Sequence, residues 1–128
     1  MSKVRMPLFE DAASGGVSVP AKYLTLGSAK AWVHFDGTGT PAVTSSLNMT
    51  SITDHAAGNF TTTKTSAMSS VLYLARAMAG VSTAASGWGL GPRVSAPTTT
   101  AWRMLTASFA FGDSDCAYTS VVYHGTLA

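Results

Sequence analysis

The sequence predicts an all-β fold, an antiparallel β-sandwich-like domain, on two observations. First, short stretches rich in aromatic and β-branched residues are separated by clusters of Gly, Asp and Asn, as strands are by turns. Second, residues 102–111 alternate, with Leu105 and Phe109 on one face and Met104 and Thr106 on the other. This period of two is that of a strand with two different faces.

Four further strands are expected, each bounded by turn-forming residues: 30–35, 42–53, 60–65 and 117–124. The first ends at a cluster of turn formers, residues 36–39 (DGTG). The last follows a turn at residues 112–115. A turn at residues 54–59 separates the second strand from the third, so these two are predicted to form a hairpin.

Residues 66–80 are compatible with two structures. Met68, Val71 and Ala75 lie at helical spacing, and the segment starts with Ser66 and ends with Gly80, which favours a helix. Alternation around Leu72 and Leu74 also fits a strand between two buried faces. The residues of this segment alone leave both structures open.

The first 28 residues differ from the rest. Pro7, Pro20 and the break at residues 14–16 leave the apolar residues too scattered for a periodic element, so we expect an extended N-terminal anchoring arm over 1–28. The β-rich fibre or knob domain then covers residues 29–128. Such an arm is either a frayed terminus or a segment that attaches the domain to an assembly. It lacks the apolar core of a signal peptide.

The composition indicates a protein that works in contact with partners. Only 11% of the residues are charged, against about 25% in typical soluble domains. Interfaces between subunits are depleted in charge, so self-association is the simplest explanation. The alternative is a Ser- and Thr-rich surface that is polar without being charged.

Several classes of function are disfavoured. The net charge of +2 arises from scattered residues, whereas nucleic-acid binding needs a clustered basic stripe. No apolar run approaches the roughly 20 residues that span a bilayer. The single cysteine, Cys116, cannot form an intramolecular disulfide and is predicted to fill space in the core.

No catalytic, cofactor-binding or metal-binding residue is predicted. His34, His55 and His124 lack the spacing of metal ligands. The aspartates fall in turn-like positions, where they usually serve the backbone: Asp36, Asp54, Asp113 and Asp115. A pair of them for glycoside hydrolysis is the disfavoured alternative.

Residues 81–100 are expected to form a long loop, and loops of that length are often functional. Trp88 lies among glycines with Arg93 nearby. A large aromatic in this setting can stack on a sugar or anchor an interface, and it can equally be a core residue. Trp88 and Arg93 are therefore the candidate receptor-contact residues.

Three segments in order resemble a region near the C-terminal end of tail-fibre proteins of tailed bacteriophages: 29–40 (AKAWVHFDGTGT), 47–54 (LNMTSITD) and 58–61 (GNFT). In that family the region reads approximately AKAWVNFNGTGT and later NVSSITDNGTGDYTVNF. The closing residues 123–128 (YHGTLA) are similar to the end of such modules. His34 and Asp36 depart from the family, where Asn is common, and residues 68–100 have no clear counterpart.

The resemblance implies a β-rich, usually trimeric virion component that is exposed on the particle and often serves host attachment. It implies no catalytic residue and favours a strand for residues 66–80. Four apolar strand residues are then predicted to form the oligomer interface or the core: Trp32, Phe35, Leu105 and Phe109.

We therefore expect a non-enzymatic structural component of a tailed-bacteriophage virion, a small fibre or spike subunit without cofactors. It would be made in the host bacterial cytoplasm and act as a homotrimer. Its expected partners are its own copies, other tail or capsid proteins through the N-terminal arm, and a host-surface glycan as a candidate ligand. The alternative is a capsid decoration or cement protein that stabilises the head without binding a receptor.

Overall fold

The chain is all-β apart from one short helix in the computed structural model, which describes residues 8–10, 18–80, 88–92, 96–108 and 112–128. In chain order the elements are β1 (Leu8–Glu10), β2 (Ser18–Pro20), α1 (Ala21–Gly27), β3 (Ala29–Asp36), β4 (Ala42–Leu47), β5 (Met49–Ala56), β6 (Asn59–Lys64), β7 (Leu74–Gly80), β8 (Trp88–Pro92), β9 (Ala101–Ser108), β10 (Gly112–Asp113) and β11 (Tyr118–His124). The predicted all-β class is confirmed.

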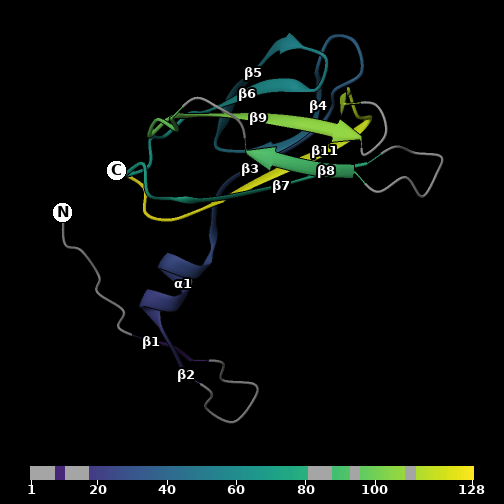
Figure 1. Ribbon diagram of the computed structural model, residues 1–128. Coiled ribbons are helices and arrows are strands. Elements are labelled where there is room, and N and C mark those ends of the chain that lie inside the picture. The colour runs from purple at the N-terminus through teal and green to yellow at the C-terminus, as the bar shows by residue number, and fades with distance from the viewer. Residues whose placement is uncertain (1–7, 11–17, 81–87, 93–95, 109–111) are drawn as a thin grey trace.

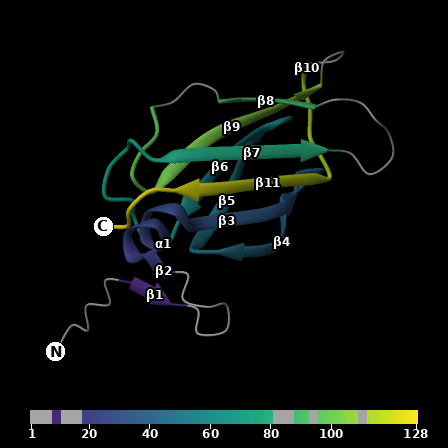
Figure 2. The ribbon, with the colours of Figure 1, turned by 90° about the horizontal axis from the view of Figure 1, so that it is seen from below.

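Two antiparallel sheets face each other (Figures 1 and 2). One has four strands in the order β4-β3-β11-β7. The other has five: β10-β9-β6-β5 in order, with β8 also pairing to β9. A separate two-stranded hairpin, β1-β2, lies with α1 outside the two sheets (Figure 1).

The core lies between the sheets because strand alternation points one residue in two inward. Along β3, Val33 and Phe35 are buried while their neighbours are partly exposed. Phe35 meets Phe60 of the facing sheet edge to face, with ring centroids 5.3 Å apart. The buried cluster consists of Ala31, Val33, Phe35, Phe60, Met104, Val121 and Tyr123. Each aromatic or aliphatic side chain buried there contributes on the order of 2 kcal/mol.

The chain changes sheet at Asn48. Residues 42–53 were expected to form one strand, but they split into β4, in the four-stranded sheet, and β5, in the five-stranded sheet. Asn48 takes a left-handed conformation with φ of 55°, which asparagine tolerates better than most residues. Its amide nitrogen donates to the Lys30 carbonyl at 3.0 Å, and its Oδ1 accepts from the Ser66 backbone at 2.8 Å. The hydrophobicity pattern carries no signal of this corner.

Replacing Asn48 with alanine is expected to cost about 2–3 kcal/mol of unfolding free energy. Two hydrogen bonds of about 1 kcal/mol each are lost, and alanine is strained at positive φ. Asn48→Gly loses the same hydrogen bonds but carries no backbone strain. Its free energy of unfolding in urea should therefore be about 1 kcal/mol higher than that of the alanine variant. Equal midpoints for the two variants would rule out a contribution from the left-handed backbone.

The predicted hairpin of residues 42–65 is confirmed for β5 and β6, which pair antiparallel across a turn at residues 57–58. The strand favoured for residues 66–80 is confirmed over Leu74–Gly80, as β7. Residues 66–73 are irregular apart from a bridge between Met68 and Leu127. Within the expected loop of 81–100, residues 88–92 form β8. The first sandwich strand begins at Ala29, and Ala21–Gly27 is helical where an extended chain was expected.

Candidate functional site

The outer face of the four-stranded sheet carries two rows of side chains that cross β11, one of its two inner strands. Register partners in an antiparallel sheet lie on the same face. Ser120 is opposite His34 on one side and Met78 on the other. Val122 is in turn opposite Trp32 and Arg76. Small residues therefore lie in the middle of the face, and longer ones lie on both flanks.

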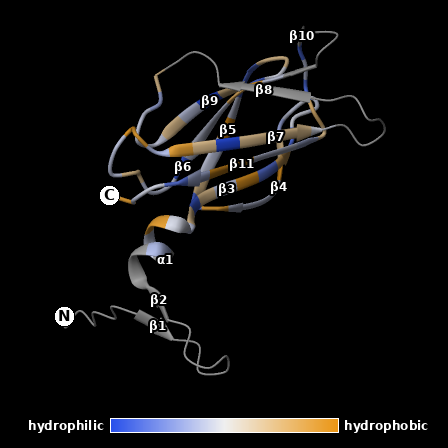
Figure 3. Cartoon of the chain, turned by 60° about the horizontal axis from the view of Figure 1, so that its bottom comes forward, coloured by the Kyte–Doolittle hydropathy of each residue, from blue (hydrophilic) through white to orange (hydrophobic). Residues whose placement is uncertain are grey.

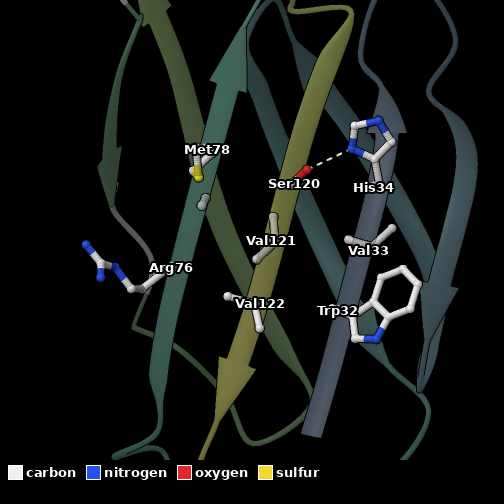
Figure 4. Close-up of a pocket in the computed structure, with 9 residues that line it drawn as sticks. Trp32, Val33, His34, Arg76, Met78, Ser120, Val121 and Val122 are labelled. Atoms are coloured by element: carbon white, nitrogen blue, oxygen red, sulfur yellow. Dashed lines mark hydrogen bonds between the residues drawn. The ribbon is translucent and has the colours of Figure 1, made fainter. Parts of the chain in front are cut away.

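This arrangement forms a groove of about 410 Å³ along β11 (Figure 4). Ser120 and Val122 form its floor. Its sides are formed by residues of β3 and β7: Trp32, His34, Arg76 and Met78. Met78 is 75% exposed and Trp32 is half-buried, so both side chains can be reached from solvent.

Two contacts hold the His34 ring in place. Its Nδ1 shares a hydrogen bond of 2.7 Å with the Ser120 hydroxyl (Figure 4). The Tyr118 ring stacks on it with a centroid distance of 6.1 Å and an angle of 29°. Nε2 has no hydrogen-bond partner among the described residues and remains available to a ligand.

The groove is basic. Arg76 and His34 are its ionisable residues, and no described carboxylate lines it. Arg76 is exposed and forms no ion pair within the part of the chain that the structure describes. Arg76 and Trp32 lie on opposite flanks of the groove, and their side chains point away from each other across β11 (Figure 4). An exposed guanidinium on one flank and an aromatic ring on the other can contact an anionic ligand with an apolar surface that spans the face.

A second group of polar residues lies inside the sandwich. The amine of Lys64, whose side chain is 2% exposed, lies 4.4 Å from the Tyr73 ring centroid and 4.3 Å from that of Tyr123. It has no hydrogen-bond partner among the described residues. Burial lowers the pKa of Lys64 to about 8. Burial also raises the pKa of Tyr123, whose hydroxyl is hydrogen-bonded to Thr62. Lys64 and Tyr123 are enclosed, so these two side chains do not face a ligand.

The four residues predicted for the oligomer interface or the core do not share one environment. Phe35 is fully buried in the core, where no second chain can contact it. Leu105 is 8% exposed. Trp32 lies on the opposite face of β3 from Phe35, in the groove. Phe109 is outside the described residues.

The prediction of Trp88 and Arg93 as receptor-contact residues stays a prediction, because one of the two lies outside the described residues. Trp88 begins β8, opposite Ser108 of β9. Arg93 is outside the described residues. The groove therefore offers a different site from the one predicted at Trp88 and Arg93.

The aspartates serve the backbone where the structure shows their contacts. Asp36 Oδ1 accepts from the backbone and hydroxyl of Thr38, and these bonds lower the pKa of its carboxyl. Asp115 accepts from the Gly58 backbone at 2.7 Å. Among the described residues, no three His, Cys, Asp or Glu side chains gather as a metal site. Cys116 is buried, as predicted.

Sequence reasoning missed Arg76, Met78, Ser120 and Val122 as site residues. Their signal was present as alternation, since Ser120 and Val122 are the outward residues of one strand and Arg76 and Met78 those of another. The pairing of β11 between β3 and β7 joins residues that are far apart in the sequence, and no pattern in the chain reveals it.

Comparisons with models of protein families, with curated proteins and with solved structures found no match to this chain. Nor does any helix in the described ranges have the length and apolar character needed to cross a membrane.

Proposed function

We propose that this chain is a non-enzymatic structural component of a tailed-bacteriophage virion, a small fibre or spike subunit that acts as a homotrimer and takes part in host attachment. The proposal is carried by the resemblance of residues 29–40, 47–54 and 58–61, in that order, to tail-fibre modules. These segments fall mainly on β3, β5 and β6, strands of one sandwich. An N-terminal segment outside the sandwich supports the same proposal.

That segment offers apolar surface without a sandwich to cover it. Helix α1 lies outside the two sheets (Figures 1 and 3), and its Leu26 is 56% exposed. Helices of seven residues are not stable alone in water and depend on tertiary packing. A partner surface for α1, on the virion or on other copies, would provide that packing. We therefore assign residues 1–28 as the anchoring arm.

The sandwich is also apolar at the end next to α1. Gly27 accepts a hydrogen bond of 3.2 Å at its carbonyl from His124, and Ser69 donates to Thr126 at 2.8 Å, so residues 69 and 126 lie near the end of the helix. Three exposed apolar residues belong to these neighbouring segments: Val71, Leu72 and Leu127. Leu72 is 92% exposed. Exposed large apolar side chains can mark an interaction site, and we assign this end to the trimer contact.

Light scattering on the purified chain is expected to give three times the chain mass of 13.2 kDa. Leu72→Ser should shift the protein toward the monomer at micromolar concentration. Val43→Ser is the matched control, because Val43 is 52% exposed but is paired with Phe35 at the other end of β3. A monomeric wild-type chain, or an equal effect of both variants, would contradict the assigned contact.

Incorporation into particles tests the arm. A chain that lacks residues 1–27 should keep its sandwich, monitored by circular dichroism, and be absent from purified virions. Folded, truncated protein that still incorporates would refute the anchoring role. Particles without the protein should adsorb poorly to hosts. Normal adsorption with lost heat resistance would instead identify a capsid decoration protein.

A further inference from the structure

We propose that the groove on the outer face of the four-stranded sheet binds a saccharide that carries a carboxylate, such as a uronic acid unit in a chain. The proposal rests on the proposed role in host attachment and names the ligand class and the residues that bind it. It places the binding site at Trp32, His34, Arg76 and Ser120.

The shape of the groove suits an elongated ligand. Its floor is the outward side of β11, where small side chains keep the centre of the face low. The outward positions continue along the same strand to Tyr118 at one end and His124 at the other. A ligand that lies along β11 would therefore pass several polar and aromatic groups in turn, as an oligosaccharide requires.

Trp32 provides the apolar contact. It is half-buried, and its register partners are Leu47 on β4 and Val122 on β11, so aliphatic side chains flank the ring on both sides. A held aromatic ring offers large contact area at little cost in conformational entropy. The carbon-bound hydrogens of a sugar form a flat apolar surface that matches this ring.

The charge favours a carboxylate. Arg76 lies across β11 from Trp32, and its planar guanidinium matches the two oxygens of a carboxylate. A phosphate carries more charge and is usually held by several cations or by free backbone amides. On this face the backbone amides of β11 are used in pairing to β3 and β7. One arginine on a face that carries no described carboxylate therefore suits a singly charged sugar acid better than a phosphate.

A second copy of the chain is a poorer occupant of this groove. If two copies met through this face, each would bury its Arg76 without a carboxylate partner, because no described carboxylate lines the groove. Burying an unpaired charge costs free energy. Asp36 is the acid nearest to His34 along β3, and its carboxylate already accepts two hydrogen bonds from Thr38.

Calorimetric titration of the full-length chain with hexagalacturonate and with its methyl ester tests the proposal, because the ester has the same sugar shape without the charge. The acid is expected to bind at least about tenfold more tightly than the ester, because a hydrogen bond to a charged group is stronger than one between neutral groups. Arg76→Gln should weaken binding of the acid about tenfold and leave the ester unchanged. Trp32→Ala should weaken both by a similar factor.

Arg103→Gln is the matched control. Arg103 lies on the other sheet, where its Nε donates to Asn59 at 2.8 Å, so its loss should not change binding. Equal affinity for acid and ester, no binding of either, or full binding by Trp32→Ala would overturn the proposal. Equal binding of dextran sulfate would show a general polyanion surface and would overturn it too. A change of mass on Trp32→Ala, measured by light scattering, would reassign the face to contact between copies.

Failure of this proposal can be distinguished from failure of the proposed function. If no saccharide binds but Trp32→Ala protein still assembles into virions, only the ligand assignment is wrong. If the wild-type chain is absent from virions, the structural role itself is wrong, whatever the chain binds in the calorimeter.

Discussion

Replacing Gly58 with alanine is expected to lower the free energy of unfolding by about 3 kcal/mol or more. Gly58 has φ of +67°, a conformation that costs other residues on the order of 1 kcal/mol. A Cβ there would also lie 2.2 Å from the Thr106 carbonyl oxygen and 2.6 Å from the Ser114 nitrogen. Both are backbone atoms, so no side chain can rotate away to make room.

The reason for this close approach is that the β5-β6 turn is docked on two other segments. Gly58 donates its N–H to Asp115 at 2.7 Å, and its carbonyl accepts from the Thr106 N–H at 2.7 Å. Moving the turn outward to admit a methyl group would break both bonds, each worth about 1 kcal/mol. The substitution would therefore weaken the packing of the β5-β6 hairpin against β9 and against the segment that leads to β11.

Gly39 provides the matched control. It has the same φ of +67°, but a Cβ built on it meets no atom within 4 Å. Gly39→Ala should therefore cost only the conformational strain, about 1 kcal/mol. Urea unfolding of the two variants separates the effects. A similar loss in both would show that the turn at Gly58 can move, and would contradict the docking described above.

The strands were largely predictable, and the way in which they assemble was not. Alternation located the start of β9, and residue content between turns located both ends of β3 and β11, each to within one residue. The change of sheet at Asn48 was missed, since β-branched and polar residues continue on both sides of it. Only a side chain that bonds to two distant segments, Lys30 and Ser66, marks this corner.

The same limit applied to the candidate site. Trp32 was singled out as an apolar strand residue, and a position three residues before Phe35 must lie on the opposite face of a strand. That was predictable. Its meeting with Arg76 was not, because it depends on β11 lying between β3 and β7. Local patterns give the face of each residue, whereas pairing between distant strands decides which residues share a site.

Lys64→Met is expected to stabilise the protein by roughly 1–2 kcal/mol at pH 7. Burial lowers the pKa of Lys64 from 10.5 to about 8, so at neutral pH the fold buries a charged amine without a hydrogen bond. This costs up to roughly 3 kcal/mol, and cation–π contacts with Tyr73 and Tyr123 offset part of it. Methionine has a similar length and packs well against aromatic rings.

The advantage of methionine should depend on pH in a defined direction. The unfolded lysine keeps its proton up to pH 10.5, whereas the folded one loses it near pH 8. Between these values the unfolded state binds more protons, so the contribution of Lys64 to stability rises with pH. The full penalty is present below pH 8. The gain from Lys64→Met should therefore be largest at pH 7 and shrink steadily toward pH 10.

Comparing the wild-type protein with Lys64→Met separates the titration of Lys64 from that of other groups whose effect on stability has the opposite sign. Burial raises the pKa of Cys116, Tyr73 and Tyr123, so these groups reduce stability as pH rises above 9 or 10. Both proteins contain them, and they cancel in the difference between the two urea-unfolding curves. Lys30→Met, at a partly exposed lysine, controls for the loss of one positive charge. A difference for Lys64→Met that stays constant from pH 7 to 10 would mean that the amine is hydrated in the folded protein. In that case the space between the two tyrosine rings would admit water, and the sandwich would be open at this point.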